Sequence, residues 1–355
     1  MLEFWPLIMA VALMSAWLTA DILIPWVVRF AHRIGNVDKP DARKVHKEPI
    51  ARLGGIAIFA GFLASLAALE WLVPGSLFVL DGPLGGVLAG AAAMFLIGVA
   101  DDLKPLPAKV KLVLQIAAAG LAYWLGVRIE FLSNPFTDGI WILPPAVSVG
   151  LTLFWLVGIT NTINLIDGLD GLAGGVSLIA AGTMTLIALQ TNQPIAALMT
   201  LALAGGIIGF LRYNFNPAKI FMGDSGSLFL GFTLAAISIT GVLKLVATVA
   251  LALPLLILGV PILDTAFAIV RRAWNRKPIF SPDRGHLHHR LLNAGLTQRR
   301  AVVVIYGISL LLGGAALTLL GIGGGPTMIG VACLFIAWGG WSIMRARLTA
   351  RPPES

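Results

Sequence analysis

The sequence predicts an all-α integral membrane protein, a polytopic bundle of about eleven transmembrane helices in one domain over residues 1–355. Of its residues, 58% are hydrophobic and only 12% are charged, and the mean hydropathy is +0.90. A soluble chain is about half apolar and about a quarter charged, so this chain cannot cover a soluble surface. Apolar stretches near the length of a membrane span also recur along the whole chain. These observations exclude a cytosolic enzyme, a secreted domain and a disordered chain.

Eleven apolar segments are the candidate spans. The first follows Glu3 with no basic residue before it and is too long for a signal peptide, so we expect it to be retained. In chain order the segments are 4–28, 53–73, 84–100, 110–126, 146–165, 172–190, 194–211, 228–243, 246–270, 301–321 and 327–344. The loop 127–145 has short β-prone pieces around Asn-Pro and Asp-Gly, which predict a small external hairpin.

Basic residues sort by side of the membrane when these segments alternate in direction. If the loop 29–52 is cytoplasmic, 23 of the 25 Lys and Arg residues are cytoplasmic, and only Arg128 and Lys244 fall outside. An excess of Lys and Arg marks cytoplasmic loops, so we expect the N-terminus outside and the C-terminus in the cytoplasm. The same rule explains the net charge of +8 without a nucleic-acid partner. The single cysteine, Cys333, excludes an internal disulfide.

Carboxylates and histidines gather in the loops that this topology places on the cytoplasmic side. We expect the active site to form from five of these loops, 29–52, 101–109, 164–171, 212–227 and 271–300. A transport pathway more often places its ionisable residues near the bilayer midplane. The one-sided set therefore favours an enzyme, and a membrane transporter is the alternative of a different class.

Paired aspartates end the third segment and three polar residues precede the sixth. Asp101 and Asp102 stand at a helix C-terminus, where the macrodipole disfavours anions; the plain alternative is a solvated turn relieved by Lys104. Asn164, Asp167 and Asp170 repeat every three residues, which makes them neighbours on a helix. A helix cap needs one such residue, so three of them favour function.

Two later motifs carry further polar groups. Asp224, in the run from Phe221 to Ser227, is either a helix cap or a hard-oxygen ligand for Mg²⁺. Phe221 is either ordinary core or an aromatic face for a base. The loop from Arg284 to Arg290 holds three histidines, which suit an anionic pyrophosphate better than structural zinc, because zinc normally takes four ligands and the only cysteine is remote. A solvated basic loop is the plain alternative.

The ordered set of motifs resembles the polyprenyl-phosphate N-acetylhexosamine-1-phosphate transferase family of membrane enzymes. The residues that carry the resemblance are KVHKEPIARLGG (44–55), DDLKPLPAKVKLVLQ (101–115), NTINLIDGLDGLAGG (161–175), NFNPAKIFMGDSGS (214–227) and RGHLHHRLLNAG (284–295). The histidine motif reads HLHHRL, with no contiguous HHH, which is similar to the branch of the family that transfers GlcNAc-1-phosphate; eleven spans also fit that branch.

The resemblance implies a reaction and its participants. UDP-GlcNAc and undecaprenyl phosphate would give undecaprenyl-diphosphate-GlcNAc and UMP, with Mg²⁺ as cofactor or Mn²⁺ in its place. The enzyme would lie in the bacterial inner membrane with a cytoplasmic active site, start the synthesis of O-antigen, common antigen or teichoic acid, and be compatible with a homodimer. The alternatives are another UDP-N-acetylhexosamine or UDP-MurNAc-pentapeptide as the donor.

Site roles follow from the same resemblance. Asp224 is the first candidate ligand of the metal, with Asn164 as the second. Asp101 is the candidate base that keeps the lipid phosphate ionised, supported by Asp102. Asp170 would read the uracil edge while Phe221 stacks on the ring. The full set of candidate catalytic residues is Asp101, Asp102, Asp167, Asp170, His288 and His289, and the candidate substrate-binding residues are Lys47, Asn164, Phe221, His286 and Arg290.

The sequence leaves open the reaction mechanism and the roles of two acidic residues. The lipid phosphate attacks the β-phosphorus directly, or a phosphorylated aspartate forms first; direct attack is the preferred hypothesis. Two intramembrane acids stand outside the motifs. Family members often carry an acid at the position of Asp264, which we interpret as a supporting residue, and Asp21 has no explanation from the sequence.

Overall fold

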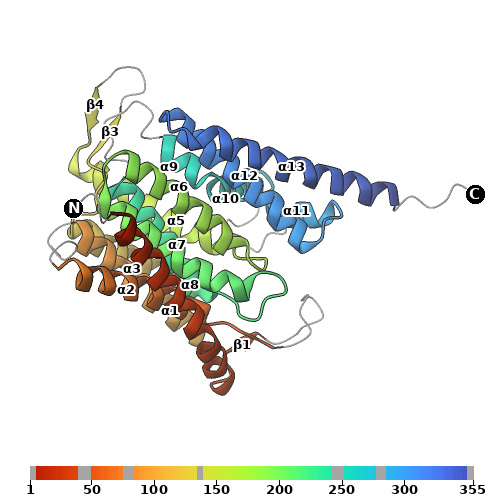
Figure 1. The fold of residues 1–355 in the computed structure, drawn as a ribbon, viewed down its shortest axis with the longest axis horizontal. Helices are drawn as coiled ribbons and strands as arrows, with labels where there is room; N and C mark the ends of the chain where they lie inside the picture. Colours follow the sequence, from red (N-terminus) through yellow and green to blue (C-terminus); the bar gives the residue numbers. More distant parts are fainter. Residues whose placement is uncertain are drawn as a thin grey trace, which may run out of the picture.

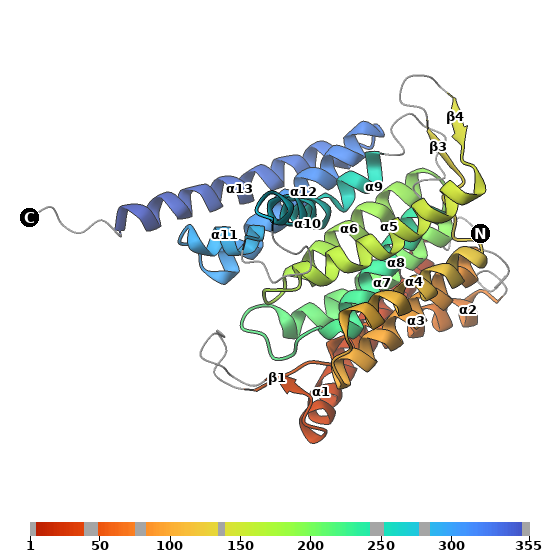
Figure 2. The ribbon, with the colours of Figure 1, turned by 180° about the vertical axis from the view of Figure 1, so that it is seen from behind.

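The computed structural model is a bundle of helices (Figures 1 and 2). It describes residues 5–38, 49–74, 83–133, 139–241, 252–276 and 285–349. The helices are α1 (Trp5–Arg33), α2 (Gly54–Leu72), α3 (Pro83–Leu103), α4 (Ala108–Trp124), α5 (Pro145–Ile166), α6 (Leu172–Gln190), α7 (Pro194–Asn214), α8 (Gly223–Thr240), α9 (Ala252–Ile257), α10 (Gly259–Trp274), α11 (Leu287–Asn293), α12 (Gln298–Leu319) and α13 (Gly324–Thr349). The strands are β1 (Val37–Asp38), β2 (Ile50–Ala51), β3 (Phe131–Ser133) and β4 (Ile140–Ile142).

Every predicted apolar segment overlaps a helix, which confirms an all-α polytopic membrane protein. Among the described residues, eight helices are long and apolar enough to cross a membrane: α1, α2, α3, α5, α6, α7, α12 and α13. Helix α4 has 17 residues, and α8 begins with a polar turn, so neither meets that standard. The count of eleven spans stays a prediction.

The ninth predicted segment, 246–270, does not form one continuous helix in its described part. It is divided at Leu258 into the short helix α9 and the helix α10. Gly259 and Pro261 follow the break directly; proline lacks an N–H and glycine is a poor helix former, so both favour an interruption there. Figure 2 shows α10 nearly end-on, at a steep angle to the other helices.

Helix α8 is the centre of the bundle. All its residues from Ser225 to Ile239 are buried, and α2, α3, α5, α6 and α7 pack around it. The backbone of α3 touches the first turn of α8, because a Cβ atom added at Gly98 would lie 2.4 Å from the carbonyl oxygen of Asp224. Only glycine permits this approach. The end of α3, which carries the paired aspartates, is thereby fixed against the start of α8.

Two small antiparallel pairings complete the fold. Strands β3 and β4 pair from Phe131–Ile142 to Ser133–Ile140, which confirms the hairpin predicted in 127–145. Strands β1 and β2 were not expected from the sequence. A parallel bridge between Ala51 and Ile220 joins β2 to the segment before α8. The loop after α1 is thereby tied to the loop after α7.

Asp21, which the sequence left unexplained, forms an ion pair at the surface of the bundle. One guanidinium nitrogen of Arg212 on α7 lies 2.9 Å and 2.8 Å from the two carboxylate oxygens of Asp21 on α1. The pair links two helices that pack closely against each other. Neither residue contacts the cluster of Asp101, Lys111, Asn164 and Asp224 in the part of the chain that the structure describes, so we interpret the pair as a structural contact.

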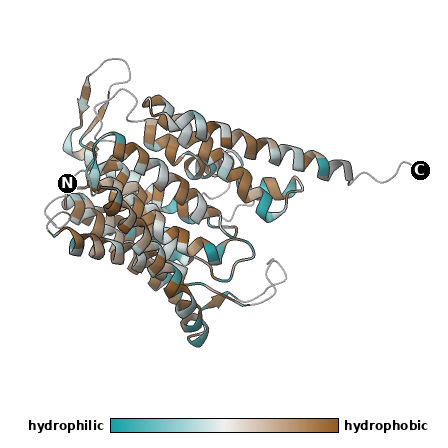
Figure 3. Cartoon of the chain, viewed as in Figure 1, coloured by the Kyte–Doolittle hydropathy of each residue, from teal (hydrophilic) through white to brown (hydrophobic). Residues whose placement is uncertain are grey.

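The loops divide between two ends of the bundle. The β3–β4 hairpin lies at one end, and β1, α11 and the segment before α8 lie at the other (Figures 1 and 2). Figure 3 shows apolar residues over the middles of the helices and hydrophilic residues mainly toward their ends. This division agrees with the sorting of basic residues; the orientation itself stays a prediction.

We expect a tag after Ser355 to be cytoplasmic and a tag inserted in 132–139 to be external, because 23 of the 25 Lys and Arg residues then fall on the cytoplasmic side. Protease accessibility in sealed cells and in inverted vesicles measures this. Both tags on one side would contradict the orientation and the cytoplasmic position of the site.

Candidate active site

Four helices bring one cluster of charged and amide side chains together. Lys111 on α4 donates through its ammonium to the carboxylate of Asp224 on α8, and the same nitrogen lies 3.4 Å from Oδ2 of Asp101 on α3. The side-chain nitrogen of Asn164 on α5 lies 3.1 Å from the other oxygen of Asp224 and 2.8 Å from Oγ of Ser227. The two predicted metal ligands, Asp224 and Asn164, are therefore neighbours.

Asp102 holds the first turn of α8. Its two carboxylate oxygens accept the backbone N–H groups of Asp224 and Ser225, at 2.8 Å and 2.9 Å. Within α8 no side chain caps this turn, so Asp224 is not its own helix cap. An anion at a helix N-terminus is stabilised by the macrodipole and by the free N–H groups. Asp102 thus positions Asp224, and its predicted support of Asp101 stays a prediction.

The paired aspartates are not relieved by Lys104, as the solvated-turn interpretation would have it. Asp101 is paired with Lys111 and also accepts the backbone N–H of Leu106 at 2.8 Å. Asp102 faces the positive end of α8. The two carboxylates therefore have separate partners, and both partners are close to the rest of the cluster.

Asn164, Asp167 and Asp170 do not share a helix face, contrary to the spacing argument. Helix α5 ends at Ile166, so Asn164 is in its last turn, and the two aspartates lie in the connection to α6. Burial raises the pKa of Asp167 to about 7, with the carboxylates of Asp102 and Asp170 adding to the effect and Arg52 opposing it. A carboxyl group with a pKa near neutrality suits proton exchange at physiological pH.

Asp170 supports a neighbouring loop. Its Oδ2 accepts the side-chain amide of Asn216 at 2.9 Å and the backbone N–H of Ala218 at 3.1 Å. Arg299, at the start of α12, donates to the carbonyl of Asn216 at 2.7 Å. The segment that leads to Phe221 is thus held from two sides. The predicted contact of Asp170 with uracil is untested, and one carboxylate oxygen is already used.

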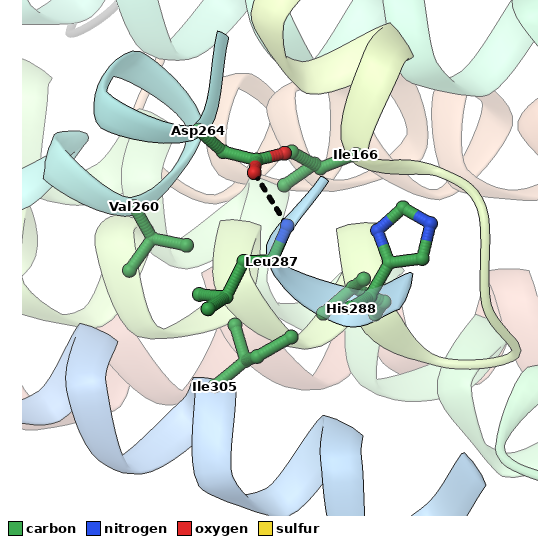
Figure 4. A pocket seen from close by; sticks show the side chains of 7 residues that line it. Ile166, Val260, Asp264, Leu287, His288 and Ile305 are labelled. Atoms are coloured by element: carbon green, nitrogen blue, oxygen red, sulfur yellow. Dashed lines mark hydrogen bonds between the residues drawn. The ribbon is translucent and has the colours of Figure 1, made fainter. Parts of the chain in front are cut away.

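The histidine motif is anchored by Asp264, which confirms a supporting place for this acid in the structure. The Nδ1 of His286 lies 2.8 Å from Oδ2 of Asp264. The backbone N–H of Leu287 donates to Oδ1 of the same carboxylate at 2.7 Å, as Figure 4 shows. His286 and Leu287 lie at the start of α11, so Asp264 fixes this end of the helix. A small cavity adjoins them, lined by Ile166, Leu172, Val260, Asp264, Leu287, His288 and Ile305.

His288 connects this loop to the connection between α5 and α6. Its side chain is 3% exposed, and a Cβ atom added at Gly168 would lie 2.9 Å from its Nε2. The ring of His289 lies 4.3 Å from that of His288, centroid to centroid. Arg290 is exposed on the same short helix. The structure therefore brings the histidine motif directly against the turn that contains Asp167 and Asp170.

Burial lowers the pKa of His288 to about 4, aided by the nearby rings of His289 and His286 and opposed by Asp264. The ring is neutral at physiological pH, so it acts as a hydrogen-bonding group and not as a cation.

This shift predicts how stability depends on pH. The unfolded chain takes up a proton near the ordinary value of 6.5 and the folded chain only near 4, so folding stability is complete above about 6.5 and falls as the pH drops toward 4. We expect His288→Gln to lose less melting temperature than the parent protein between pH 7.5 and pH 5. Thermal unfolding in detergent at both pH values measures this; equal losses in the two proteins would contradict it.

The residues around Asp224 include oxygen groups that could hold Mg²⁺. Mg²⁺ takes oxygen ligands, usually one or two protein carboxylates together with substrate phosphates. Asp224 and Asp101 supply carboxylate oxygens, and a half-turn of the Asn164 amide would present its oxygen to the same place. The ammonium of Lys111 between the two carboxylates shows that the position accepts positive charge.

Zinc at the histidine motif has no support from the geometry. Across the described ranges, no three His, Cys, Asp or Glu side chains form a group that could hold a metal ion. One ring nitrogen of His286 is engaged by Asp264. A metal held by few protein ligands and by substrate phosphates, as expected for Mg²⁺, is compatible with this finding.

Of the remaining predicted residues, the structure describes Phe221 but not Lys47. Phe221 is half-buried; its N–H donates to the carbonyl of Ala51 at 2.7 Å, and its carbonyl accepts the N–H of Gly54 at 2.9 Å. It is therefore held where β2, α2 and α8 meet. Lys47 lies outside the described residues, and so does Arg284 at the start of the histidine motif.

Several residues of the site were not among the candidate site residues predicted from the sequence. Arg52 contributes positive charge near Asp167, and the hydroxyl of Tyr306 on α12 donates to the carbonyl of Gly171 at 2.5 Å. Lys111 is the most important of them. Its signal was available, since it follows the paired aspartates on an apolar helix, but its partner Asp224 is far away in sequence.

Comparison with known proteins gives consistent matches. Residues 84–242 match the model of the family described as glycosyl transferase family 4. A probable undecaprenyl-phosphate N-acetylglucosaminyl 1-phosphate transferase of Bacillus subtilis is 42% identical, over 87% of this chain and 84% of the relative. A decaprenyl-phosphate N-acetylglucosaminephosphotransferase of Mycobacterium tuberculosis is 38% identical, over 78% and 74%. The undecaprenyl-phosphate alpha-N-acetylglucosaminyl 1-phosphate transferase of Escherichia coli is 30% identical, over 82% and 79%.

Proposed function

The chain belongs to glycosyl transferase family 4, among the polyprenyl-phosphate N-acetylhexosamine-1-phosphate transferases, and on that premise we propose that it transfers GlcNAc-1-phosphate from UDP-GlcNAc to undecaprenyl phosphate. The products are undecaprenyl-diphosphate-GlcNAc and UMP. The relatives are named for this transfer to undecaprenyl or decaprenyl phosphate. The chain is therefore an enzyme and a multi-pass membrane protein.

The observation that carries the proposal is the cluster of Asp101, Lys111, Asn164 and Asp224 at one end of an apolar bundle. A lipid phosphate reaches such a place from the bilayer surface, and a nucleotide-sugar reaches it from water. Both substrates are anionic, so their approach requires positive charge and hydrogen-bond donors. The histidine motif, against the connection after α5, supplies further donors.

Each group has a proposed part in the reaction. Asp224 and Asn164 would hold Mg²⁺, which when bound would supply positive charge to the diphosphate and to the departing UMP. Asp101 accepts a proton from the lipid phosphate and so keeps it ionised. Asp167, whose pKa is about 7, is a second carboxyl group suited to hold this proton. His286, His288, His289 and Arg290 orient the pyrophosphate or the sugar, while Phe221 and Lys47 contact the nucleotide.

The preferred step is direct displacement. An oxygen of the lipid phosphate forms a bond to the β-phosphorus of the donor, the bond from that phosphorus to the bridging oxygen breaks, and UMP leaves with the electron pair. The alternative passes through a phosphorylated aspartate. A covalent intermediate would catalyse exchange of labelled UMP into UDP-GlcNAc without any acceptor lipid, and direct displacement would not.

The donor is tested by a panel of nucleotide sugars. We expect release of UMP from UDP-GlcNAc by the purified protein with undecaprenyl phosphate and Mg²⁺, and at least about tenfold lower kcat/KM for UDP-GalNAc and UDP-MurNAc-pentapeptide, because lost or unpaired polar contacts to a substrate are costly. A higher kcat/KM for either competitor would replace GlcNAc as the sugar and leave the transfer chemistry in place.

The cellular setting follows from the same proposal. The enzyme lies in the bacterial inner membrane with its site on the cytoplasmic side, where nucleotide-sugars are found, and it starts the assembly of an envelope polysaccharide. A homodimer stays a prediction from the family resemblance.

A further inference from the structure

The ammonium of Lys111 shares the carboxylate at which the metal is proposed to bind. Asp224 has two oxygens: Asn164 donates to one, and Lys111 contacts the other. The side chains of Lys111 and Asp224 are 18% and 19% exposed, so this ion pair is largely removed from water. Charges at such a place interact more strongly than the same charges at an exposed surface.

The position of Lys111 is fixed by the packing of α4. One helical turn deeper in the bundle, Gln115 of α4 accepts a hydrogen bond from the side chain of Asn161 on α5 at 2.7 Å. Gln115 is 1% exposed. Residues four apart lie on one face of a helix, so this bond also directs Lys111 toward α5 and α8. The contact with Asp224 is a built feature of the helix pair.

A second carboxylate, that of Asp101, lies close to the same ammonium. Oδ2 of Asp101 lies 3.4 Å from the nitrogen of Lys111. The ammonium can therefore leave Asp224 and keep an anionic partner, with a small movement of a flexible side chain. A divalent cation on Asp224 would repel the ammonium, and phosphate groups beside that cation would attract it.

We propose that Lys111 and the divalent cation compete for the Asp224 carboxylate, so that arrival of the cation with its substrate releases the ammonium toward the phosphate groups. This inference rests on the proposed function, since it takes Asp224 as the metal ligand. Lys111 lowers the affinity for metal alone and couples metal binding to the anionic substrates. It thereby disfavours tight binding of metal at a site without substrate.

The test is a titration of the purified full-length protein with Mn²⁺ alone, following free Mn²⁺ by electron paramagnetic resonance. We expect Lys111→Met to bind Mn²⁺ at least about tenfold more tightly than the parent protein, because removal of a neighbouring positive charge favours a cation. Lys111→Arg keeps the charge and should stay within about threefold of the parent. Lys109→Met removes an exposed lysine of the same helix and should leave the affinity unchanged.

Asp224→Asn tests the metal site separately from the competition with Lys111. We expect this variant to bind Mn²⁺ at least about tenfold more weakly than the parent protein. If it does so, and Lys111→Met leaves the affinity unchanged or weaker, the competition is wrong while the metal site stands. If Asp224→Asn binds Mn²⁺ like the parent, the metal position itself is wrong and the inference fails with it. Lys111→Gln is the second variant if Lys111→Met does not fold, as judged by thermal unfolding in detergent.

Discussion

Asp224→Asn is expected to reduce kcat at least about 100-fold, to near the detection limit, while the protein still inserts and folds. The variant loses the anionic ligand proposed for Mg²⁺, and it loses one of the two carboxylates that Lys111 contacts. Single groups that stabilise developing charge are typically worth about 100-fold to 1,000-fold in turnover. The change keeps the shape of the side chain, and Asp102 holds the start of α8 through the backbone N–H groups of Asp224 and Ser225 and not through the side chain of Asp224, so we expect the fold to be retained.

The measurement is UMP release at saturating UDP-GlcNAc over a range of Mg²⁺ concentrations. Asp21→Asn is the matched control, because it also removes a paired carboxylate from a membrane helix but lies outside the cluster. We expect it to retain activity within about threefold. Near-normal turnover of Asp224→Asn with unchanged Mg²⁺ dependence would show that Asp224 has only a structural place at the start of α8.

The second large effect is expected in the histidine motif. His288→Ala and His289→Ala should each lower kcat at least about tenfold, and at least as strongly as they raise the KM for UDP-GlcNAc. The reason is that donors to the pyrophosphate matter most as charge builds on the departing UMP phosphate. His288 is buried against Gly168, so its loss also removes a contact between α11 and the turn after α5.

Steady-state kinetics of both variants, with His288→Gln as the shape-conserving control for the buried ring, separates the alternatives. A kcat/KM within about threefold of the parent for both alanine variants would identify a merely solvated basic loop. Inactivation by zinc-selective chelators in excess Mg²⁺ would identify a zinc site. Either result would remove the histidines from the proposed chemistry.

The helices and the grouping of the loops could be predicted because they depend on local composition. Apolar segments of the right length become helices in a bilayer, since every backbone polar group must be satisfied within the segment. The predicted ranges therefore overlap the helices of the structure. The hairpin after α4 is equally local, because Asn-Pro and Asp-Gly turns flanked by β-prone residues lie within one short stretch.

The partners of the site residues could not be predicted, because they are distant in sequence. Asp102 accepts hydrogen bonds from residues 122 and 123 positions later, and Lys111 meets a carboxylate 113 positions later. Nothing in the pattern around the paired aspartates distinguishes the one that caps α8 from the one that pairs with Lys111. Those roles depend on how closely α3 and α4 approach α8.

One expectation failed, and one apolar segment forms two helices in its described part, each for an identifiable reason. The three-residue spacing of Asn164, Asp167 and Asp170 indicated one helix face, but the glycines that follow each aspartate allow α5 to end at Ile166 and α6 to begin after a left-handed residue, Gly171, with φ of 80°. The ninth apolar segment is interrupted because Gly259 and Pro261 weigh more than hydropathy at that point. In the first case local backbone chemistry overrode the spacing of the polar residues, and in the second it overrode hydropathy.

The central claim is that a sugar phosphate is transferred, and not the sugar alone. UDP-GlcNAc labelled with ³²P at the β-phosphorus tests this most directly, with purified protein, undecaprenyl phosphate and Mg²⁺. We predict that the label moves into the lipid fraction and that unlabelled UMP is released in equal amount. Release of labelled UDP, with an unlabelled glycolipid, would show transfer of the sugar by cleavage at the anomeric carbon and would contradict the account.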